Sequence, residues 1–224
     1  MALSDLELPE GLELRRDERG LALAGDGMEL RGDFAHLLPR LRQDRLHREL
    51  LVRAARVRGV EAPTAVDATA GLGEDALLLA AAGFEVTLCE RDPVIAALLA
   101  DALARVQEDE RLAEVAGRMQ LVEGDAKETL ASLDEAPDVV FLDPMFPERR
   151  RRASTNKKLQ LFQRLERPCE DEEALMAAAL AARPRKVVVK RPLKGPYLAG
   201  VKPSSSLAGK VVRYDVIVPP QNPA

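Results

Sequence analysis

The sequence predicts an α/β fold in which a doubly wound, mostly parallel sheet carries helices on both faces, preceded by a small N-terminal α+β piece. Three observations support this prediction. Short apolar runs alternate with helical patterns from residue 61 onward, a glycine-containing turn, "DATAGLGED", directly follows the first of these runs, and unusual polar residues follow several of the others. Ligands bind beyond the carboxyl ends of the strands in such sheets, so we expect the functional residues there.

The first 60 residues differ in pattern from the rest. Residues 12–34 alternate in polarity between glycine-containing turns, which predicts short strands. Apolar residues at helical spacing predict a helix over about 40–58. Gly59 and Pro63 then interrupt the pattern, so we expect residues 1–60 to form a small N-terminal subdomain.

Residues 61–218 show the alternation of a parallel α/β domain, and residues 219–224 are a proline-rich C-terminal tail. In chain order we expect a strand ending at Asp67, a helix over 76–82, a strand over 84–89, a helix opening at Pro93, strands over 118–126 and 136–144, a helix over 171–182, and strands over 186–192 and 209–218.

The charge of the chain is unevenly distributed. The 224 residues carry a net charge of −4, yet residues 148–167 sum to +6 and residues 183–194 sum to another +6. The remaining residues therefore sum to −16. Positive charge concentrated in two segments predicts one basic face that binds a polyanion, although two solvent-exposed charged segments would give the same net charges.

Several classes of protein are disfavoured by composition. The apolar runs are short and broken by charge, so no membrane span is expected, and the N-terminus lacks a signal-peptide pattern. Cys89 and Cys169 offer no disulfide framework, and His36 and His47 are too scattered for a metal site. We therefore expect a cytoplasmic protein without a metal, while the oligomeric state is left open.

A nucleoside-containing cofactor is predicted by residues that follow the first two strands. Gly71 and Gly73 permit a tight turn and close approach of a ligand, and Asp67 precedes that turn. Glu90 ends the second strand, where a carboxylate can accept both hydroxyls of a ribose. A structural turn and a surface glutamate are the plain alternatives.

Nicotinamide dinucleotides and S-adenosylmethionine both fit those residues. Glu74 and Asp75 place negative charge where a pyrophosphate would lie, which favours the cationic S-adenosylmethionine. Asp125, in "EGDA" after the third strand, is placed to accept a hydrogen bond from an adenine amine, although aspartate is also common in turns.

The stretch "LDPMF" after the fourth strand predicts the catalytic residues. It resembles the signature of methyltransferases that modify exocyclic or amide nitrogens. Asp143 and the carbonyl of Pro144 can accept the two N–H bonds of a planar amine, and Phe146 can stack on its ring. The cations that follow predict contacts to RNA phosphates: Arg149, Arg150, Arg151, Arg152, Lys157 and Lys158, with Lys190 and Arg191 at the end of the next strand.

Four stretches together resemble one family: "DATAGLGEDALLLA", "LCERDPVIAALLADALAR", "VVFLDPMFP" and "KVVVKRP". They are similar to the bacterial small-subunit ribosomal RNA guanine-N2 methyltransferase J family from about Val66 to Val218. The resemblance implies a class I methyltransferase fold, S-adenosylmethionine as methyl donor with S-adenosylhomocysteine as product, and a guanine of 16S rRNA, free or in the small ribosomal subunit, as acceptor. The cofactor contacts that it implies fall on Glu74, Asp75, Glu90, Arg91, Asp125, Ala126 and Asp143.

The chain departs from that family at a few positions. The family usually has arginine where this chain has Glu74, and small hydroxyl residues where it has Asp125 and Ala126. Two other interpretations remain open from the residues: a nitrogen methyltransferase of DNA or of protein glutamine, and a non-catalytic RNA-binding module that kept the fold.

Overall fold

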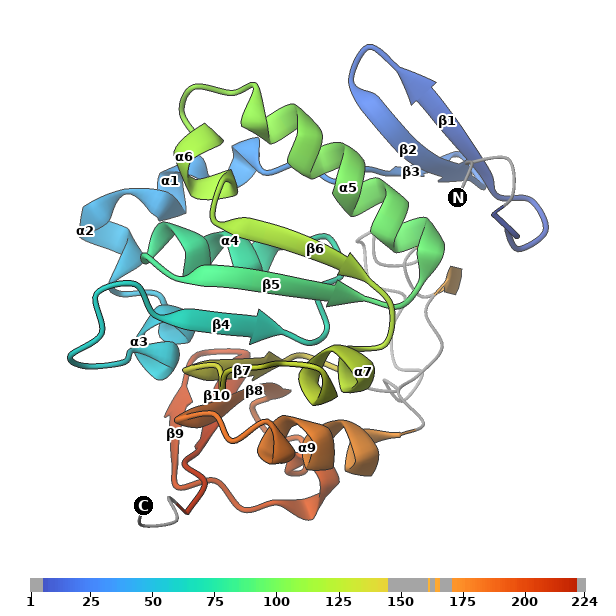
Figure 1. Ribbon diagram of the computed structural model, residues 1–224. Helices are drawn as coiled ribbons and strands as arrows, with labels where there is room; N and C mark the ends of the chain where they lie inside the picture. The colour runs from blue at the N-terminus through green and yellow to red at the C-terminus, as the bar shows by residue number, and fades with distance from the viewer. Residues whose placement is uncertain (1–5, 145–160, 162–163, 166–170, 221–224) are drawn as a thin grey trace.

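The centre of the computed structural model is a seven-stranded sheet (Figure 1); the structure describes residues 6–144, 161, 164–165 and 171–220. Its strands are β4 (Thr64–Asp67), β5 (Glu85–Glu90), β6 (Met119–Glu123), β7 (Val139–Leu142), β8 (Lys186–Pro192), β9 (Ser205–Ala208) and β10 (Val212–Ile217). They lie in the order β6-β5-β4-β7-β8-β10-β9, in which β4 to β8 pair in parallel and β10 runs antiparallel to both neighbours. The predicted doubly wound, mostly parallel sheet is confirmed, and its order reverses between β4 and β7.

Helices cover both faces of the sheet. One apolar cluster joins the sheet to α3 (Leu50–Ala55), α4 (Glu74–Ala81), α5 (Pro93–Gln107) and α6 (Ala113–Ala116). A second cluster joins the other face to α7 (Ala126–Ala131), α9 (Glu172–Ala181) and the short 3-10 helix η3 (Leu198–Gly200). Phe141 and Val188 face the first cluster, whereas Leu142 and Val189 face the second, as the alternation of side chains along a strand requires. No helix in the described part of the chain is long and apolar enough to cross a membrane.

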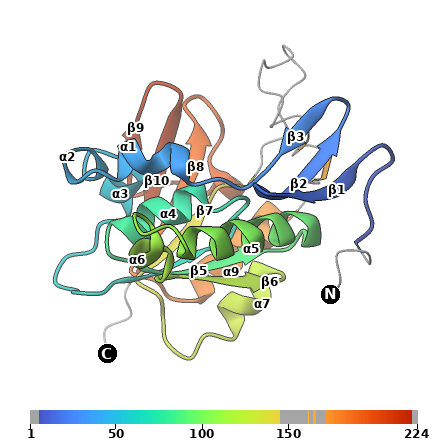
Figure 2. The ribbon, with the colours of Figure 1, turned by 90° about the horizontal axis from the view of Figure 1, so that it is seen from above.

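The first strands form a separate antiparallel sheet of β1 (Glu13–Asp17), β2 (Gly20–Gly25) and β3 (Met28–Leu30), which packs beside α5 (Figures 1 and 2). Leu21, Leu23 and Leu30 pack with Val94 and Leu98 of α5. The sheet is therefore anchored to the helix that follows β5, close to the carboxyl edge of the large sheet.

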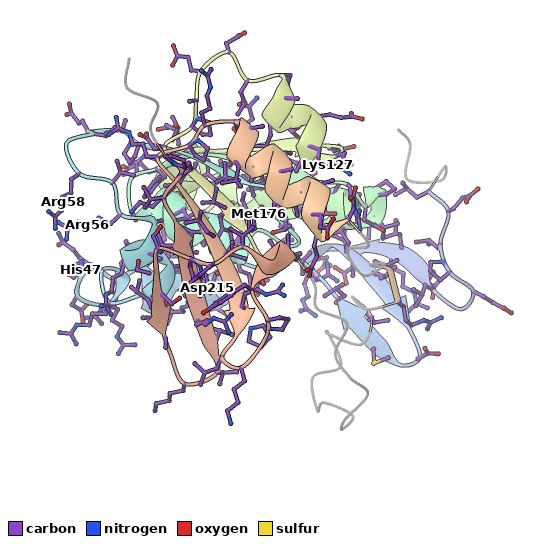
Figure 3. All side chains as sticks on the ribbon, turned by 90° about the horizontal axis from the view of Figure 1, so that it is seen from below. His47, Arg56, Arg58, Lys127, Met176 and Asp215 are labelled. Atoms are coloured by element: carbon purple, nitrogen blue, oxygen red, sulfur yellow. The ribbon has the colours of Figure 1, made fainter. Side chains whose placement is uncertain are left out.

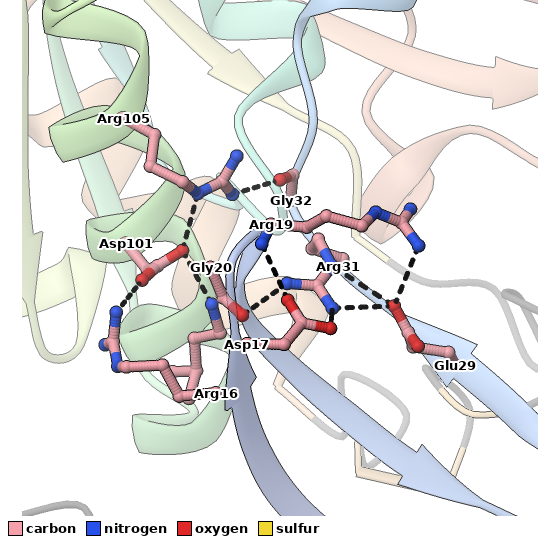
Figure 4. A network of polar contacts seen from close by, with 10 residues as sticks. Arg16, Asp17, Arg19, Gly20, Glu29, Arg31, Gly32, Asp101 and Arg105 are labelled. Atoms are coloured by element: carbon pink, nitrogen blue, oxygen red, sulfur yellow. Dashed lines mark hydrogen bonds and ion pairs between the residues drawn. The ribbon is translucent and has the colours of Figure 1, made fainter.

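A buried carboxylate fixes this packing (Figure 4). Asp101 of α5 accepts hydrogen bonds from Arg16 at 2.6 Å, from the backbone N–H of Leu21 at 2.9 Å and from Arg105 at 2.8 Å. Arg105 also donates to the carbonyl of Gly32. A buried charge is tolerated when it is paired and hydrogen-bonded in this way, so the network defines how the small sheet sits on α5.

The single helix expected over about 40–58 is wrong. Three short helices occupy this region: α1 (Leu38–Leu41), α2 (Gln43–Leu46) and α3, preceded by the 3-10 helix η2 (Ala35–Leu37). Arg42 and Glu49 have ψ values of 135° and 129°, which break the helical path, and Glu49 is held there by two hydrogen bonds from Arg40 at 2.9 and 2.8 Å. Helix α3 packs in the same apolar cluster as the large sheet, while the division of the chain at residue 60 stays a prediction.

Candidate functional site

A cavity of about 850 Å³ lies at the carboxyl edge of the large sheet. The loops after four neighbouring strands contribute to its wall: Ala68 and Thr69 after β4, Arg91–Val94 after β5, Gly124–Lys127 after β6, and Asp143 and Pro144 after β7. Glu7–Pro9 and Arg164 and Leu165 line it as well. The cavity therefore lies where the order of the strands reverses, which is the usual ligand site of this architecture.

Glu90 is held firmly at the end of β5. One of its carboxylate oxygens accepts the backbone N–H of Gly71 at 2.9 Å, and the other accepts that of Asp92 at 2.8 Å. The residue is 5% exposed and lines the cavity. Burial raises the pKa of Glu90 above its ordinary value, and the two backbone N–H groups oppose that rise. Each oxygen keeps lone-pair capacity for a further donor, so the group can accept a pair of ligand hydroxyls.

The turn that contains Gly71 and Gly73 supplies one of the two N–H groups that hold Glu90. Gly71 and Gly73 have φ values of 54° and 77°, so both use the left-handed region that glycine favours. A Cβ on Gly73 would lie 2.8 Å from Cδ1 of Leu99 and 3.3 Å from Cζ of Phe34. Glycine at position 73 thus suits the left-handed backbone and the packing against Leu99 and Phe34, whereas the sequence suggested close approach of a ligand.

Asp125 begins helix α7 at the edge of the same cavity. Its side chain accepts the backbone N–H of Lys127 at 2.8 Å, which caps the helix. Ala126 follows as the first helical residue and also lines the cavity. The Nζ atom of Lys127 lies 2.5 Å from Asp171 and 3.4 Å from Asp125, so this lysine links the starts of α7 and α9 across the cavity wall.

Asp143 is fixed at the end of β7 through both its backbone and its side chain. Its backbone N–H donates to the hydroxyl of Thr69 at 2.7 Å, and its carboxylate lies 2.8 Å from Nζ of Lys190. Lys190 also lies 2.6 Å from the carboxylate of Asp75, the second residue of α4. Burial raises the pKa of Asp143 above its ordinary value, while Lys190 opposes that rise.

Asp67 lies at the end of β4 in the interior of the protein. It is 1% exposed and accepts the backbone N–H of Thr69 at 3.1 Å. Burial raises its pKa well above the ordinary value, and the nearby charge of Asp75 adds to the rise. Asp67 therefore supports the loop that carries Thr69 and is not part of the cavity wall.

The structure brings together only part of the predicted cofactor set. Glu90, Arg91, Asp125, Ala126 and Asp143 line the cavity, whereas Asp67, Gly71, Gly73, Glu74 and Asp75 are not among the residues that line it in the described part of the chain. Glu74 is half exposed and lies 3.4 Å from Nε2 of His36. Among the catalytic candidates, Pro144 lines the cavity with Asp143, and Phe146 lies outside the described residues.

The predicted basic face is only partly described. Arg149, Arg150, Arg151, Arg152, Lys157 and Lys158 lie outside the described residues. Lys190 is paired with two carboxylates, and Arg191 is 1% exposed and donates to the carbonyl of Pro196 at 3.0 Å and to Glu172 at 3.3 Å. The position of the Arg191 side chain therefore does not fit the phosphate contact expected of it.

The second basic segment, residues 183–194, is also divided between two edges of the sheet. Lys186 begins β8 and donates to the carbonyls of Ala54 and Arg56 of the α3 region, whereas Lys190 lies near the end of the strand. In Figure 3, Arg56 and Arg58 lie at the left edge of the molecule, away from Lys127, which borders the cavity. The segment therefore does not form a single surface at the cavity.

Several residues that line the cavity were not predicted from the sequence, among them Thr69, Lys127, Arg164 and Asp171. Thr69 could have been suspected from its place directly after the first strand. The others lack a local signal, because each reaches the cavity through a pairing between distant segments; Arg164, for example, binds Asp26 and the carbonyl of Glu10. No group of three or more His, Cys, Asp and Glu side chains in the described ranges is placed to hold a metal ion.

Comparison with known proteins agrees with this geometry. A family model described as "Putative SAM-dependent methyltransferase" matches residues 10–219. Ribosomal RNA small subunit methyltransferase J of Thioalkalivibrio sulfidiphilus is 46% identical over 92% of this chain and 84% of that protein. The proteins of the same name from Chromobacterium violaceum and Pseudomonas aeruginosa are 51% and 47% identical over 70% and 75% of this chain, which corresponds to 62% and 65% of their own lengths.

A solved structure extends the agreement to the fold. The crystal structure of a SAM-dependent methyltransferase from Neisseria gonorrhoeae matches with a TM-score of 0.76 and 33% identity, over 95% of this chain and 85% of that one. An rRNA methyltransferase from Streptomyces viridochromogenes, with a TM-score of 0.52 and 19% identity, shares the fold alone. Since the family model covers nearly the whole chain and the sheet has the same architecture, the chain belongs to the SAM-dependent methyltransferase family, whose cofactor is S-adenosylmethionine.

Proposed function

We propose that the protein transfers a methyl group from S-adenosylmethionine to the exocyclic N2 of a guanine in 16S rRNA. The observation that carries this proposal is the placement of Asp143 and Pro144 in the same cavity as Glu90 and Asp125. The names of the similar proteins supply the ribosomal substrate, and the resemblance of "DPMFP" supplies the exocyclic amine. Such a substrate places the enzyme in the cytoplasm.

The cavity fits the cofactor in size and in donor set. Its volume of about 850 Å³ is in the range of small-molecule sites. Glu90 would hold the ribose hydroxyls, and Asp125, with its cap on α7, would accept from the adenine amine. When bound, the cofactor supplies an electrophilic methyl group, to which the amine nitrogen donates its lone pair as the methyl–sulfur bond breaks and its electrons stay on sulfur.

Asp143 and Pro144 would position the substrate amine. The Asp143 carboxylate and the Pro144 carbonyl can accept the two N–H bonds of a flat amine and so turn its nitrogen toward the methyl group. Asp143 suits this role because its backbone is tied to Thr69 and its carboxylate to Lys190. A pre-oriented acceptor needs little rearrangement during the reaction.

The same carboxylate would stabilise the charge that develops on the amine. N2 of guanine is a weak nucleophile because its lone pair is delocalised, and it becomes positive as the new C–N bond forms. The negative Asp143 opposes that charge and can then accept the proton that the nitrogen releases. Its raised pKa, caused mainly by burial, makes it a better proton acceptor than an exposed aspartate.

The RNA must present an unstacked guanine to this cavity. Removing a base from its stack costs a few kcal/mol, which stacking on Phe146 would offset. Arg149–Arg152, directly after the catalytic turn, would contact the neighbouring phosphates.

The test is transfer of tritiated methyl groups to small ribosomal subunits that lack the modification, followed by nucleoside analysis. The proposal predicts labelled N2-methylguanosine in 16S rRNA. Parallel reactions with naked 16S rRNA, duplex DNA and a glutamine-containing peptide distinguish the acceptor. Label in another nucleoside, or in DNA or peptide alone, would overturn the assignment of the substrate.

A further inference from the structure

Lys190 lies directly beside the proposed catalytic aspartate at the carboxyl edge of the sheet. Strands β7 and β8 pair in parallel with Leu142 opposite Val189, so Asp143 and Lys190 are the next residues on the two strands. Phe141 and Val188, two residues earlier on each strand, face the cluster that contains α4. Side chains alternate along a strand, which explains why Asp143 and Lys190 both turn toward Asp75 on the first turn of α4.

The ammonium of Lys190 joins two carboxylates that would otherwise repel each other. Its Nζ lies 2.6 Å from Oδ2 of Asp75 and 2.8 Å from Oδ2 of Asp143, and the three side chains are 20–36% exposed. Burial acts to lower the pKa of Lys190, but the two carboxylates outweigh it and raise that pKa above its ordinary value. The lysine is therefore held as a cation between the two acids.

Other charged and titratable groups lie close enough to this cluster to act on its charges. They are Asp67 of β4, Arg191 of β8, Tyr214 of β10 and, toward Asp75, Arg40 of α1. Asp75 adds negative charge near Asp143, and Lys190 contacts the Asp143 carboxylate directly.

We propose that Lys190 is a positioning residue of the methyl transfer, whose ammonium binds Oδ2 of Asp143 and leaves Oδ1 to accept from the substrate amine. This inference rests on the proposed function, because it assigns the amine to Asp143. It replaces the phosphate contact that the sequence suggested for Lys190. Lys190 already contacts two carboxylates, and moving its ammonium to a phosphate would leave both acids without that partner.

Removal of the ammonium has a specific consequence. Without Lys190, Asp143 loses the contacting cation that most favours its charged form, while Asp75 continues to disfavour that form. The pKa of Asp143 then rises further and a larger fraction of it holds a proton, and a protonated carboxyl group accepts the amine poorly. Removal of Asp75 has the opposite consequence, because Lys190 then serves Asp143 alone.

The experiment measures kcat and KM for small ribosomal subunits from pH 6 to 9 in four variants: Lys190→Met, Lys190→Arg, Asp75→Asn and Lys186→Met. For Lys190→Met we expect kcat at pH 7 to fall on the order of 10- to 100-fold, with partial recovery at pH 9 and little change in KM. Lys190→Arg keeps a cation and should retain more activity than Lys190→Met. Asp75→Asn should move the acid limb of the profile to lower pH, and Lys186→Met, at the other end of the same strand, should keep the wild-type profile.

Two measurements keep the test decisive if a variant folds poorly. Thermal melting and S-adenosylhomocysteine binding verify each fold, and NMR titration of the Lys190 ammonium in wild-type protein should show it protonated to a pH above the ordinary range of lysine. A wild-type pH profile in Lys190→Met, or a raised KM at unchanged kcat, would overturn the inference. Absence of methyl transfer by the wild-type enzyme would instead refute the proposed function, while an ordinary titration of Lys190 would refute the ion pairing by itself.

Discussion

Substitution of Glu90 by glutamine tests the cofactor site most directly. The two carboxylate oxygens of Glu90 each accept one backbone N–H, from Gly71 and Asp92, in a position that is 5% exposed. A glutamine has the same shape but only one oxygen, so its NH₂ group must face one of these two donors. A hydrogen bond to a charged group is worth about 1.5 to 3 kcal/mol, and we expect the free energy of unfolding to fall by about that amount.

The same substitution removes an acceptor for the ribose. Binding of S-adenosylhomocysteine should weaken by about 1 to 3 kcal/mol, which is roughly a 5- to 150-fold rise in Kd. Isothermal titration calorimetry gives the affinity, and urea denaturation gives the stability. Glu123→Gln is the matched control, because Glu123 lies opposite Glu90 on β6 but is exposed and does not line the cavity. Equal affinities in wild type and Glu90→Gln would refute the ribose assignment, and binding of NAD in this assay would revive the dinucleotide alternative.

Four further predictions address the remaining parts of the site. Asp143→Asn should lower kcat on the order of 100- to 1000-fold while RNA affinity in a filter-binding assay stays within about twofold, since the carboxylate acts on the developing charge; equal loss of both would contradict its catalytic role. Replacement of Arg149–Arg152 by alanine should leave cofactor affinity intact and reduce the log–log salt slope of RNA binding by about 0.7 to 0.9 for each phosphate that the arginines neutralise in the wild type; an unchanged slope would mean that these arginines are simply solvated. Gly73→Ala should destabilise the fold by roughly 2 to 5 kcal/mol in urea denaturation, because the new Cβ meets Leu99 at a left-handed φ. For Asp67→Asn, the free energy of unfolding should increase relative to that of wild type as pH rises above about 4. Burial raises the pKa of Asp67 in the folded protein above its unfolded value, so wild type loses stability with rising pH until the folded group ionises. Parallel curves of unfolding free energy against pH for the two proteins would contradict this sign.

The sequence was sufficient for the large sheet but not for the region before it. Strands β4 to β8 are short apolar runs between clear turn signals, and their local pattern agrees with the fold, so they could be predicted within a few residues. The region from α1 to α3 has helical spacing throughout, yet its backbone leaves the helical path at Arg42 and Glu49, and Arg40 binds Glu49 from the preceding helix. A contact between side chains nine residues apart leaves no trace in the periodicity of the sequence.

The site residues that could be predicted from the sequence are those that lie at or just after the end of a predicted strand. Glu90, Asp125 and Asp143 each lie at or just after the end of a strand, and each lines the cavity. The roles of Lys190 and Arg191 were not predictable in this way, because a charged residue at a strand end has the same sequence signal whether it faces solvent or a buried acid. Lys190 pairs with acids on α4 and after β7, and Arg191 packs against the loop at Pro196, and both partners depend on the tertiary fold.

The preference for S-adenosylmethionine over a dinucleotide holds for a different physical reason than the sequence suggested. The sequence argument placed the charges of Glu74 and Asp75 against a pyrophosphate, but Asp75 is paired with Lys190, and Glu74 lies beside His36 and does not line the cavity. A pyrophosphate in such a turn needs free backbone N–H groups and an open path to the glycines. Here the N–H of Gly71 is already donated to Glu90, and the open side of Gly73 is filled by Leu99 and Phe34. The turn therefore holds the carboxylate of Glu90, the proposed acceptor of the ribose hydroxyls, and its Gly71 N–H is not available to a pyrophosphate.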